Sequence, residues 1–389
     1  MIWLWISLAL VVGGAQLAWW AAEPALAPPY ENPSRYPELV YYHGCQSGPS
    51  VSAKAAILVE ATTGTILYAR NEHEVREPAS ITKVMTAIVA IERGDLSDTV
   101  KVSAGAARVG GSSLHLSAGA TYKLEELVRA TMLRSGNDGA TAIAEHIAGS
   151  VSSFVSLMNV RAYSMGLKNT HFANPHGLSA PGHYTTAYDI ALMCMTGFRL
   201  KKFADIVGCP ELWSSPLGGG SRLVYNTNRL LWSMAGADGV KTGTTSQAGH
   251  CLAASATRNG LQFIAVVLRS GARFADAAAL LEYGFARFTR HVIAKRGEPV
   301  AEVLVSGGRG SAVGLAPTRD VEVVLAIADS AKLTWRAEVP ERAPRSVQAG
   351  QGLGRIRVLY DGEEICSYPL YAVEGVAKRR GRAPWVGGR

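Results

Sequence analysis

Three short polar motifs stand in order along this chain of 389 residues, and they constrain its fold more than any other feature. The motifs are Ser80-Ile81-Thr82-Lys83, Ser135-Gly136-Asn137 and Lys241-Thr242-Gly243. Each is short enough to occur by chance. Together they supply a hydroxyl with an amine beside it, a second hydroxyl with an amide, and a cation on a strand. A fold that uses all three must bring distant segments to one site.

The first motif opens a segment that is apolar nearly all round, which predicts a buried helix from Ser80 to about Ile91. Lys83 is the exception, because a buried lysine is costly unless it is paired or neutral. Ser80 and Lys83 are three residues apart and share one helix face. Burial and a second cation would lower the pKa of Lys83, and a neutral amine can accept the proton of Ser80. The motif alone also fits an N-cap serine beside a lysine that reaches the surface.

The second motif lies between two predicted helices, roughly 124–133 and 140–147. Ser135 offers a hydroxyl that both donates and accepts, and Asn137 offers an amide that can hold a substrate carbonyl. The alternative is an ordinary connection in which Asn137 caps the next helix.

The third motif is predicted to lie on a strand edge. There Lys241 and Thr242 supply a cation and a hydroxyl, and Gly243 lacks the Cβ that would block an extended peptide. This arrangement suits a peptide that ends in a carboxylate. The alternative is a strand-end turn rich in threonine and glycine.

The apolar pattern predicts an α+β fold: an antiparallel sheet flanked by helices, with an inserted helical subdomain. Strands are expected at both ends of this region, and helices between them and after them. The expected strands are 55–60, 65–68, 252–257 and 261–268, and a helix is expected at 275–288. An Asn259-Gly260 turn of type I′ joins the last two strands. Beyond Gly297 short alternating strands, such as 321–325 and 354–358, predict a small C-terminal all-β domain.

The first segment bears on the cellular compartment. Residues 2–22 carry no charged side chain, and Ala25-Leu26-Ala27 resembles a signal-peptide cleavage site. The pair Trp19-Trp20 would instead suit a retained anchor at a membrane interface. Both alternatives place the rest of the chain outside the cytoplasm. The predicted organisation is 1–27 signal peptide or N-terminal membrane anchor, 28–50 linker or arm, 51–296 main domain, 297–376 C-terminal β-sandwich-like domain and 377–389 basic tail.

Composition and motif content limit the kinds of binding partner that can be expected. An apolar fraction of 48% fits a globular protein, and the net charge of +8 comes without any nucleic-acid-binding motif, so no nucleic acid is expected. None of the five cysteines forms a Cys-x-x-Cys pair, and no His-Glu-x-x-His segment occurs, so no metal is expected. The cysteines are expected to be small buried hydrophobes. A pair between Cys194 and Cys209 stays open.

With their flanking sequences, the three motifs resemble the low-molecular-mass penicillin-binding proteins, which are serine-type D-alanyl-D-alanine carboxypeptidases. The similar blocks are 77–86, 111–114, 132–138, 174–178, 238–245 and 282–285. The resemblance covers roughly residues 51 to 290 and continues more faintly through the β domain. It implies a β-lactamase/DD-peptidase-like fold, no cofactor, and removal of the terminal D-alanine from peptidoglycan stem peptides through an acyl-enzyme.

The resemblance also implies a role for each site residue. Ser80 is the acylated nucleophile, Lys83 is its base, and Ser135 relays a proton to the departing D-alanine. The implied substrate-binding residues are Asn137, Lys241, Thr242, Gly243, Thr244 and Arg273. Asn137 would hold the substrate amide, Lys241, Thr242 and Arg273 the terminal carboxylate, and the N–H groups of Ser80 and Thr244 the oxyanion. His176 and Asp189 match family positions near the site, where a structural role is equally expected.

β-Lactams are expected to acylate Ser80, because they mimic the dipeptide. The chain departs from anchored family members in its tail, where glycine and proline interrupt any amphipathic helix. Membrane contact is therefore expected through the N-terminal segment, with the basic tail adding adhesion. Three alternatives stay open: a DD-endopeptidase acting on cross-links, a serine β-lactamase, and a non-catalytic protein that binds β-lactam or peptidoglycan. The β-lactamase alternative lacks the Glu-x-x-Leu-Asn loop of class A enzymes, since no Leu-Asn dipeptide occurs.

Overall fold

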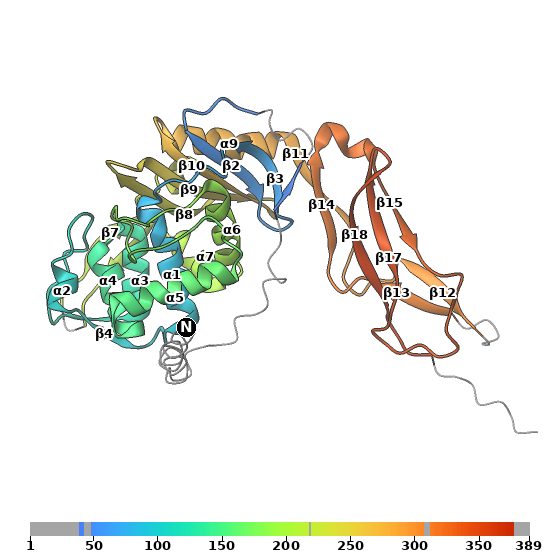
Figure 1. The fold of residues 1–389 in the computed structure, drawn as a ribbon, viewed down its shortest axis with the longest axis horizontal. Coiled ribbons are helices and arrows are strands. Elements are labelled where there is room, and N and C mark those ends of the chain that lie inside the picture. Colours follow the sequence, from blue (N-terminus) through green and yellow to red (C-terminus); the bar gives the residue numbers. More distant parts are fainter. Residues whose placement is uncertain (1–38, 43–47, 218, 307–311, 377–389) are drawn as a thin grey trace, which may run out of the picture.

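The protein is described by a computed structural model, in which residues 39–42, 48–217, 219–306 and 312–376 can be described. It comprises an α+β domain and a smaller β domain beside it (Figure 1). The α+β prediction is confirmed. The predicted leader 1–27, most of the arm 28–50, Cys45 and the basic tail 377–389 lie outside the described residues.

A six-stranded sheet forms the frame of the first domain, in the order β1-β3-β2-β10-β9-β8. Its strands are β1 (Val40–Tyr41), β2 (Ala55–Glu60), β3 (Thr65–Arg70), β8 (Ala237–Thr245), β9 (Gly249–Arg258) and β10 (Leu261–Ser270). The pair β1–β3 is parallel and the other pairs are antiparallel. The sheet therefore joins early strands to late ones through the β2–β10 pair, and β8 with the third motif forms one edge.

Both faces of the sheet are covered. Ile57 and Val59 of β2 face the core shared with the helices, whereas Ala56 and Leu58 face the core shared with α9 (Arg273–Arg287). Because successive side chains of a strand point to opposite faces, a strand covered on both sides is apolar throughout. All six residues of β2 are buried accordingly, and all but Glu60 at its end are apolar.

The helical subdomain is inserted between β3 and β8 (Figure 1). Its helices are η2 (Ala79–Thr82), α1 (Lys83–Arg93), α2 (Ala104–Ala107), α3 (Leu124–Arg134), α4 (Asn137–Ala148), α5 (Val151–Ser164), α6 (Ala187–Phe198), α7 (Lys201–Val207) and α8 (Leu230–Ser233). Two short antiparallel pairs accompany them: β4 (Thr99–Lys101) with β5 (Thr121–Lys123), and β6 (Glu211–Ser214) with β7 (Arg222–Tyr225). As predicted, α1 is buried along most of its length.

Three predicted helix boundaries are wrong. The segment from Ser80 begins as a 3₁₀ turn, stabilised by the Thr82 hydroxyl donating to the Ala79 carbonyl, and α1 starts only at Lys83. Helix α4 begins at Asn137 rather than 140, because the left-handed conformation of Ser135 ends α3 and lets the chain turn at once into the next helix. Helix α9 covers 273–287 instead of 275–288.

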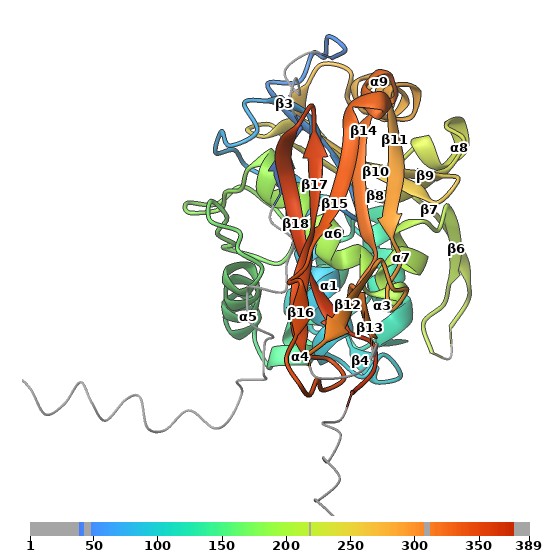
Figure 2. The same cartoon turned by 90° about the vertical axis from the view of Figure 1, so that its right-hand side faces the viewer.

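The C-terminal domain is built of strands, as predicted. A two-stranded ribbon of β11 (Phe288–Ala294) and β14 (Val321–Ala326) accompanies a six-stranded sheet in the order β15-β17-β18-β13-β12-β16. These strands are β12 (Ala301–Val305), β13 (Ala312–Ala316), β15 (Leu333–Glu338), β16 (Arg342–Ala343), β17 (Gly352–Tyr360) and β18 (Glu363–Ala372), and a 3₁₀ turn, η3 (Ile327–Lys332), precedes β15. Figure 2 shows β14, β15, β17 and β18 running lengthwise along this domain. Because β11 pairs with β14, the strand ahead of the expected boundary at 296/297 belongs to the C-terminal sheets.

The arm residue Tyr42 connects the two domains. Its ring lies edge-on to Phe288 at 5.3 Å between centroids, and its hydroxyl donates to Asp329 of η3. Burial and this carboxylate raise the pKa of Tyr42. The neighbouring β1 extends the sheet along β3, so the arm is tied to both domains.

The four described cysteines are free thiols. Cys194 and Cys251 are buried, and burial raises the pKa of both. The Cys194–Cys209 pair that the sequence left open is not formed.

Candidate active site

Ser80 lies on a strained turn, and Gly177 and Gly243 leave the space that this turn occupies. Ala79, before it, has a left-handed backbone with φ of 48°. A Cβ on Gly177 would lie 1.9 Å from the Ala79 carbonyl oxygen, and a Cβ on Gly243 would lie 3.2 Å from the Ser80 nitrogen. Gly243 thus lets the β8 edge approach the Ser80 segment itself, which is a reason that the sequence did not reveal.

The Lys83 amine lies at the centre of the site and is fully buried. Its Nζ is 3.0 Å from Ser80 Oγ, 2.7 Å from Asn137 Oδ1 and 2.6 Å from the His176 carbonyl oxygen. The last two atoms can only accept, because the Asn137 amide nitrogen donates to the Gly110 carbonyl at 2.7 Å. A neutral amine gives them its two hydrogens and turns its lone pair toward Ser80.

The surroundings of Lys83 favour that neutral form. Burial lowers the pKa of Lys83 well below its usual value, and the nearby charge of Lys241 lowers it further, while Asp138 acts in the opposite direction. Burial thus disfavours the charged amine, and no ion pair with a carboxylate offsets this effect among the described residues.

The start of α4 holds the second motif in place. The Asn137 N–H donates to the Ser112 carbonyl at 2.7 Å, and Asn137 is only 2% exposed. Ser135, 5% exposed, lies two residues ahead on the turn that ends α3, with φ of 69°. The structure thus brings the first two motifs together through the Lys83–Asn137 contact.

The β8 edge presents the third motif. Lys241 is 1% exposed and donates to the Thr242 carbonyl, while the Thr242 hydroxyl lies 2.7 Å from that of Thr227. Arg273, at the start of α9, donates to the Gly243 carbonyl at 2.9 Å and to the Thr244 hydroxyl at 2.8 Å.

Three basic side chains, Lys83, Lys241 and Arg273, lie here without a carboxylate of their own. Burial, followed by the charge of Arg273, lowers the pKa of Lys241 to about 7. Burial also lowers the pKa of Arg273. No ion pair with a carboxylate occurs at Lys83, Lys241 or Arg273 among the residues that the structure describes. This field suits an anionic ligand.

The sequence did not identify Asp138 as part of this arrangement. Its carboxylate is 0% exposed and accepts from the Leu114 and Leu116 N–H groups and from the Ser113 hydroxyl. It thereby fixes the loop that faces the site. Its place directly after Asn137 in the first turn of α4 is the signal that marks it.

Two histidines line the back of the site in neutral form. Nδ1 of His183 accepts from the Ala173 N–H at 2.9 Å, so Nε2 carries the hydrogen toward Thr82 Oγ1 at 2.8 Å. Burial lowers the pKa of His183 to about 4 and that of His176 to about 3, the latter also through Lys83. Asp189 lies apart from the site, accepting from the Asn169 N–H and the Thr170 hydroxyl, which is a structural role.

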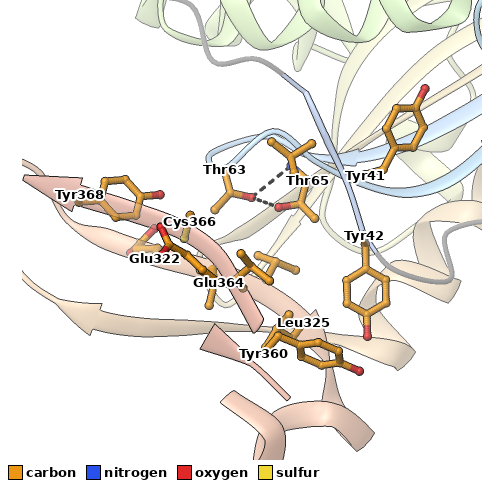
Figure 3. Close-up of a pocket in the computed structure, with 14 residues that line it drawn as sticks. Tyr41, Tyr42, Thr63, Thr65, Glu322, Leu325, Tyr360, Glu364, Cys366 and Tyr368 are labelled. Carbon is orange, nitrogen blue, oxygen red and sulfur yellow. Dashed lines mark hydrogen bonds between the residues drawn. The ribbon is translucent and has the colours of Figure 1, made fainter. Parts of the chain in front are cut away.

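Two cavities flank the sheet. A cleft of about 670 Å³ adjoins the site and is lined by Thr227 and Arg273 among others. A separate cavity of about 260 Å³ lies between the domains, where Thr63 and Thr65 face strands β14 and β18 (Figure 3). Neither cavity is lined by the motif residues themselves, but Thr227 and Arg273 of the first cleft contact Thr242 and Gly243 of the third motif. The two carboxylates of the second cavity, Glu322 and Glu364, already pair with arginines. We therefore place the functional site at the first cleft.

Over the described ranges, no group of three or more histidine, cysteine or acidic side chains could hold a metal ion. Within those same ranges, no helix combines the length and apolar character needed to cross a bilayer.

Comparison with known proteins decides the family. Residues 44–272 match the family described as D-alanyl-D-alanine carboxypeptidase, and 288–378 match the penicillin-binding protein 5 C-terminal domain. D-alanyl-D-alanine carboxypeptidase DacF of Bacillus subtilis is 35% identical over 335 residues, which cover 84% of this chain and 86% of the relative. The chain belongs to the D-alanyl-D-alanine carboxypeptidase family. The resemblance seen in the motifs is thus confirmed.

Solved structures of family members share the fold. Penicillin binding protein 5 from Haemophilus influenzae aligns with a TM-score of 0.75 at 31% identity, covering 84% of this chain and 98% of that one. The Streptomyces K15 DD-transpeptidase aligns with a TM-score of 0.59 at 32% identity, covering 62% of this chain and 99% of that one.

Proposed function

We propose that this chain is a serine-type D-Ala-D-Ala carboxypeptidase that removes the terminal D-alanine from peptidoglycan stem pentapeptides through an acyl-enzyme on Ser80. The observation that carries the proposal is the Lys83 amine, 3.0 Å from Ser80 Oγ, with its other two neighbours fixed as acceptors. Family membership supplies the substrate class.

Acylation follows from this geometry. The Ser80 hydroxyl gives its proton to the lone pair of Lys83 while Oγ attacks the carbonyl carbon of the penultimate D-alanine. The developing oxyanion lies between the 3₁₀ turn and the β8 edge, where the N–H groups of Ser80 and Thr244 are proposed to donate. The C–N bond then breaks and leaves an ester on Ser80.

Substrate binding rests on the β8 edge. An extended stem peptide lies along β8, with its amide on Asn137 and its terminal carboxylate on Thr242, Lys241 and Arg273. The positive charge of Arg273 and Lys241 supports this orientation, because neither forms an ion pair with a carboxylate among the described residues. Gly243 keeps this edge close to the nucleophile.

Ser135 completes the reaction in this proposal. It relays a proton from Lys83 to the amine of the departing D-alanine, which makes that amine a neutral leaving group. Water then attacks the ester by the reverse route, with Lys83 as the base. β-Lactams enter the same step, but their ring nitrogen stays tethered, so a stable ester on Ser80 is expected.

We also propose that the enzyme is exported and acts on the cell wall, with residues 1–27 as a signal peptide or membrane anchor. The support is the uncharged run 2–22 together with the wall peptide as substrate. Membrane contact in this proposal uses that segment and the basic tail. The chain is then part of peptidoglycan synthesis and of cell-shape control.

A single assay tests the function. Residues 28–389, which keep β1 and Tyr42, are incubated with a stem pentapeptide ending in D-Ala-D-Ala, and released D-alanine is quantified beside the Ser80→Ala variant. We expect release by the unmodified enzyme and none by the variant, whereas absence of release from folded enzyme contradicts the proposal. Penicillin with mass spectrometry separates the rivals: lasting labelling of Ser80 fits the carboxypeptidase, and rapid unlabelled turnover fits a β-lactamase.

A further inference from the structure

An arginine-rich cleft continues from the β8 edge and is not accounted for by the terminal D-alanine. It has a volume of about 670 Å³ and includes Arg134, Arg229 and Arg273, with Tyr225 and Phe274 beside them. No aspartate or glutamate lines it. Arg134 and Arg229 are exposed, and neither forms an ion pair with a carboxylate within the described part of the chain.

The position of the cleft relates it to the leaving group. Its lining residue Thr227 contacts Thr242, and Arg273 contacts both Gly243 and Thr244. These contacts mark where the carboxylate of the leaving residue is proposed to bind. The cleft therefore lies beyond the position proposed for the carboxylate of the leaving D-alanine. D-alanine has no further group that could reach into it.

The backbone holds the arginines at this position. The Thr227 N–H donates to the Leu133 carbonyl at 3.0 Å, which joins the turn carrying Arg229 to the end of α3 carrying Arg134. The buried Asn228 amide donates to the Gly239 carbonyl at 2.6 Å and so fixes the same turn to β8. Two guanidinium groups on anchored backbone suit a carboxylate, which arginine can bind through two parallel hydrogen bonds.

We propose that this cleft is a leaving-group subsite in which Arg134 and Arg229 bind a second carboxylate, so that acidic leaving groups are released in preference to neutral ones. The inference rests on the proposed function, since the reaction is the same: the amide C–N bond breaks, the acyl group passes to Ser80 and the amine leaves with a proton. The second carboxylate belongs either to an acidic D-amino acid or to a neighbouring, cross-linked stem peptide.

The test compares matched leaving groups. The substrates are one acyl-D-Ala peptide ending in D-Glu, D-Gln or D-Ala, and a cross-linked stem-peptide dimer in its free-acid and amidated forms. For the unmodified enzyme we expect kcat/KM to be about fivefold higher for the D-Glu substrate than for the D-Gln substrate, or for the free-acid dimer than for the amidated dimer. A factor of about five is the contribution expected from one partly solvated ion pair. In Arg134→Gln and Arg229→Gln this ratio falls toward one. The control Lys101→Gln removes an equal charge from β4, outside the cleft, and keeps the ratio.

The outcomes separate this inference from the function itself. Preference in the D-Glu pair assigns the subsite to acidic amino acids, and preference only in the dimer pair assigns it to cross-linked peptide. Equal rates in both pairs, with D-alanine still released, overturn the subsite alone. A ratio that persists in both arginine variants also overturns it. Loss of all release by the unmodified enzyme contradicts the proposed function instead.

Discussion

Lys83 and Lys241 of the α+β domain are 0% and 1% exposed, whereas Lys332 of the C-terminal domain lies at the surface. The buried pair has no carboxylate partner among the described residues, and burial lowers the pKa of both amines. Lys332 lies 3.0 Å from Asp329, and that partner raises its pKa. The surroundings thus shift the pKa of a lysine down in the first domain and up in the second.

The difference between these lysines shows that the α+β domain buries amines without an ion-pair partner, which costs folding stability, whereas the described part of the C-terminal domain does not. An amine that has lost its charge by burial can take a proton, which an amine in a surface ion pair cannot do at neutral pH. The charges of the C-terminal domain are paired across strands, as for Glu338 of β15 with Arg355 and Arg357 of β17. These pairs fit an ordinary solvated sheet face.

The largest effect is expected at Lys83. In Lys83→Ala and in Lys83→Arg, kcat/KM for D-alanine release should fall by about 10³-fold or more, since the first variant has no base and the second cannot be deprotonated. Circular dichroism checks that both are folded. Lys332→Arg is the control from the other domain and should keep full activity. Activity in Lys83→Arg near that of the unmodified enzyme would contradict the claim that residue 83 must lose its charge to act as the base.

Gly177→Ala should be the next largest effect. Its Cβ would overlap the carbonyl of Ala79, so the Ser80 turn must shift, and we expect a loss of about 3 kcal/mol or more in unfolding free energy. Gly149→Ala is the matched control, because Gly149 has a similar positive φ of 73° with no atom within 4 Å. That variant should lose only about 1–2 kcal/mol. Both unfolding free energies are measured with denaturant. Equal losses in the two variants would show that the cost comes from the positive φ and not from the contact with Ala79.

The buried histidines predict a pH effect in the α+β domain. His183 has a pKa of about 4 in the folded protein and about 6.5 when unfolded. Below pH 6.5 the unfolded chain binds the proton first, so stability falls as the pH drops from 6.5 to 4, by up to about 3 kcal/mol. Unfolding free energies over this range should show a shallower slope in His183→Gln, and an unchanged slope would contradict the neutral His183.

The smallest effect is expected at Lys332. Lys332→Met removes an exposed ion pair with Asp329, so thermal unfolding should shift by about 1 °C or less, and D-alanine release should be unaffected. Calorimetry beside the release assay checks both. A loss of activity would mean that the C-terminal domain is coupled to the site.

Local chemistry could be predicted from the sequence, and long-range contacts could not. The spacing of Ser80 and Lys83, the apolar run after them and the Asn259-Gly260 turn depend on neighbours in the chain, and the structure contains all three. The partners of Lys83 on other segments, Asn137 and the His176 carbonyl, are set only when the helices pack.

The missed features have the same origin. Asp138 orders a loop more than twenty residues upstream, and Arg134 and Arg229 come together only because the Thr227 turn binds the end of α3. Tyr42 of the arm meets η3 across 287 residues. No local pattern encodes such pairs.

The central claim is that Lys83 is neutral beside Ser80, and a direct titration tests it. The enzyme is labelled with ¹³C at the lysine ε-carbons, and the Lys83 signal is identified by its loss in Lys83→Arg. The account predicts that this signal titrates well below the ordinary lysine pKa of about 10.4. Titration at or above that value would contradict the account, because the amine would then be charged and unable to accept the Ser80 proton.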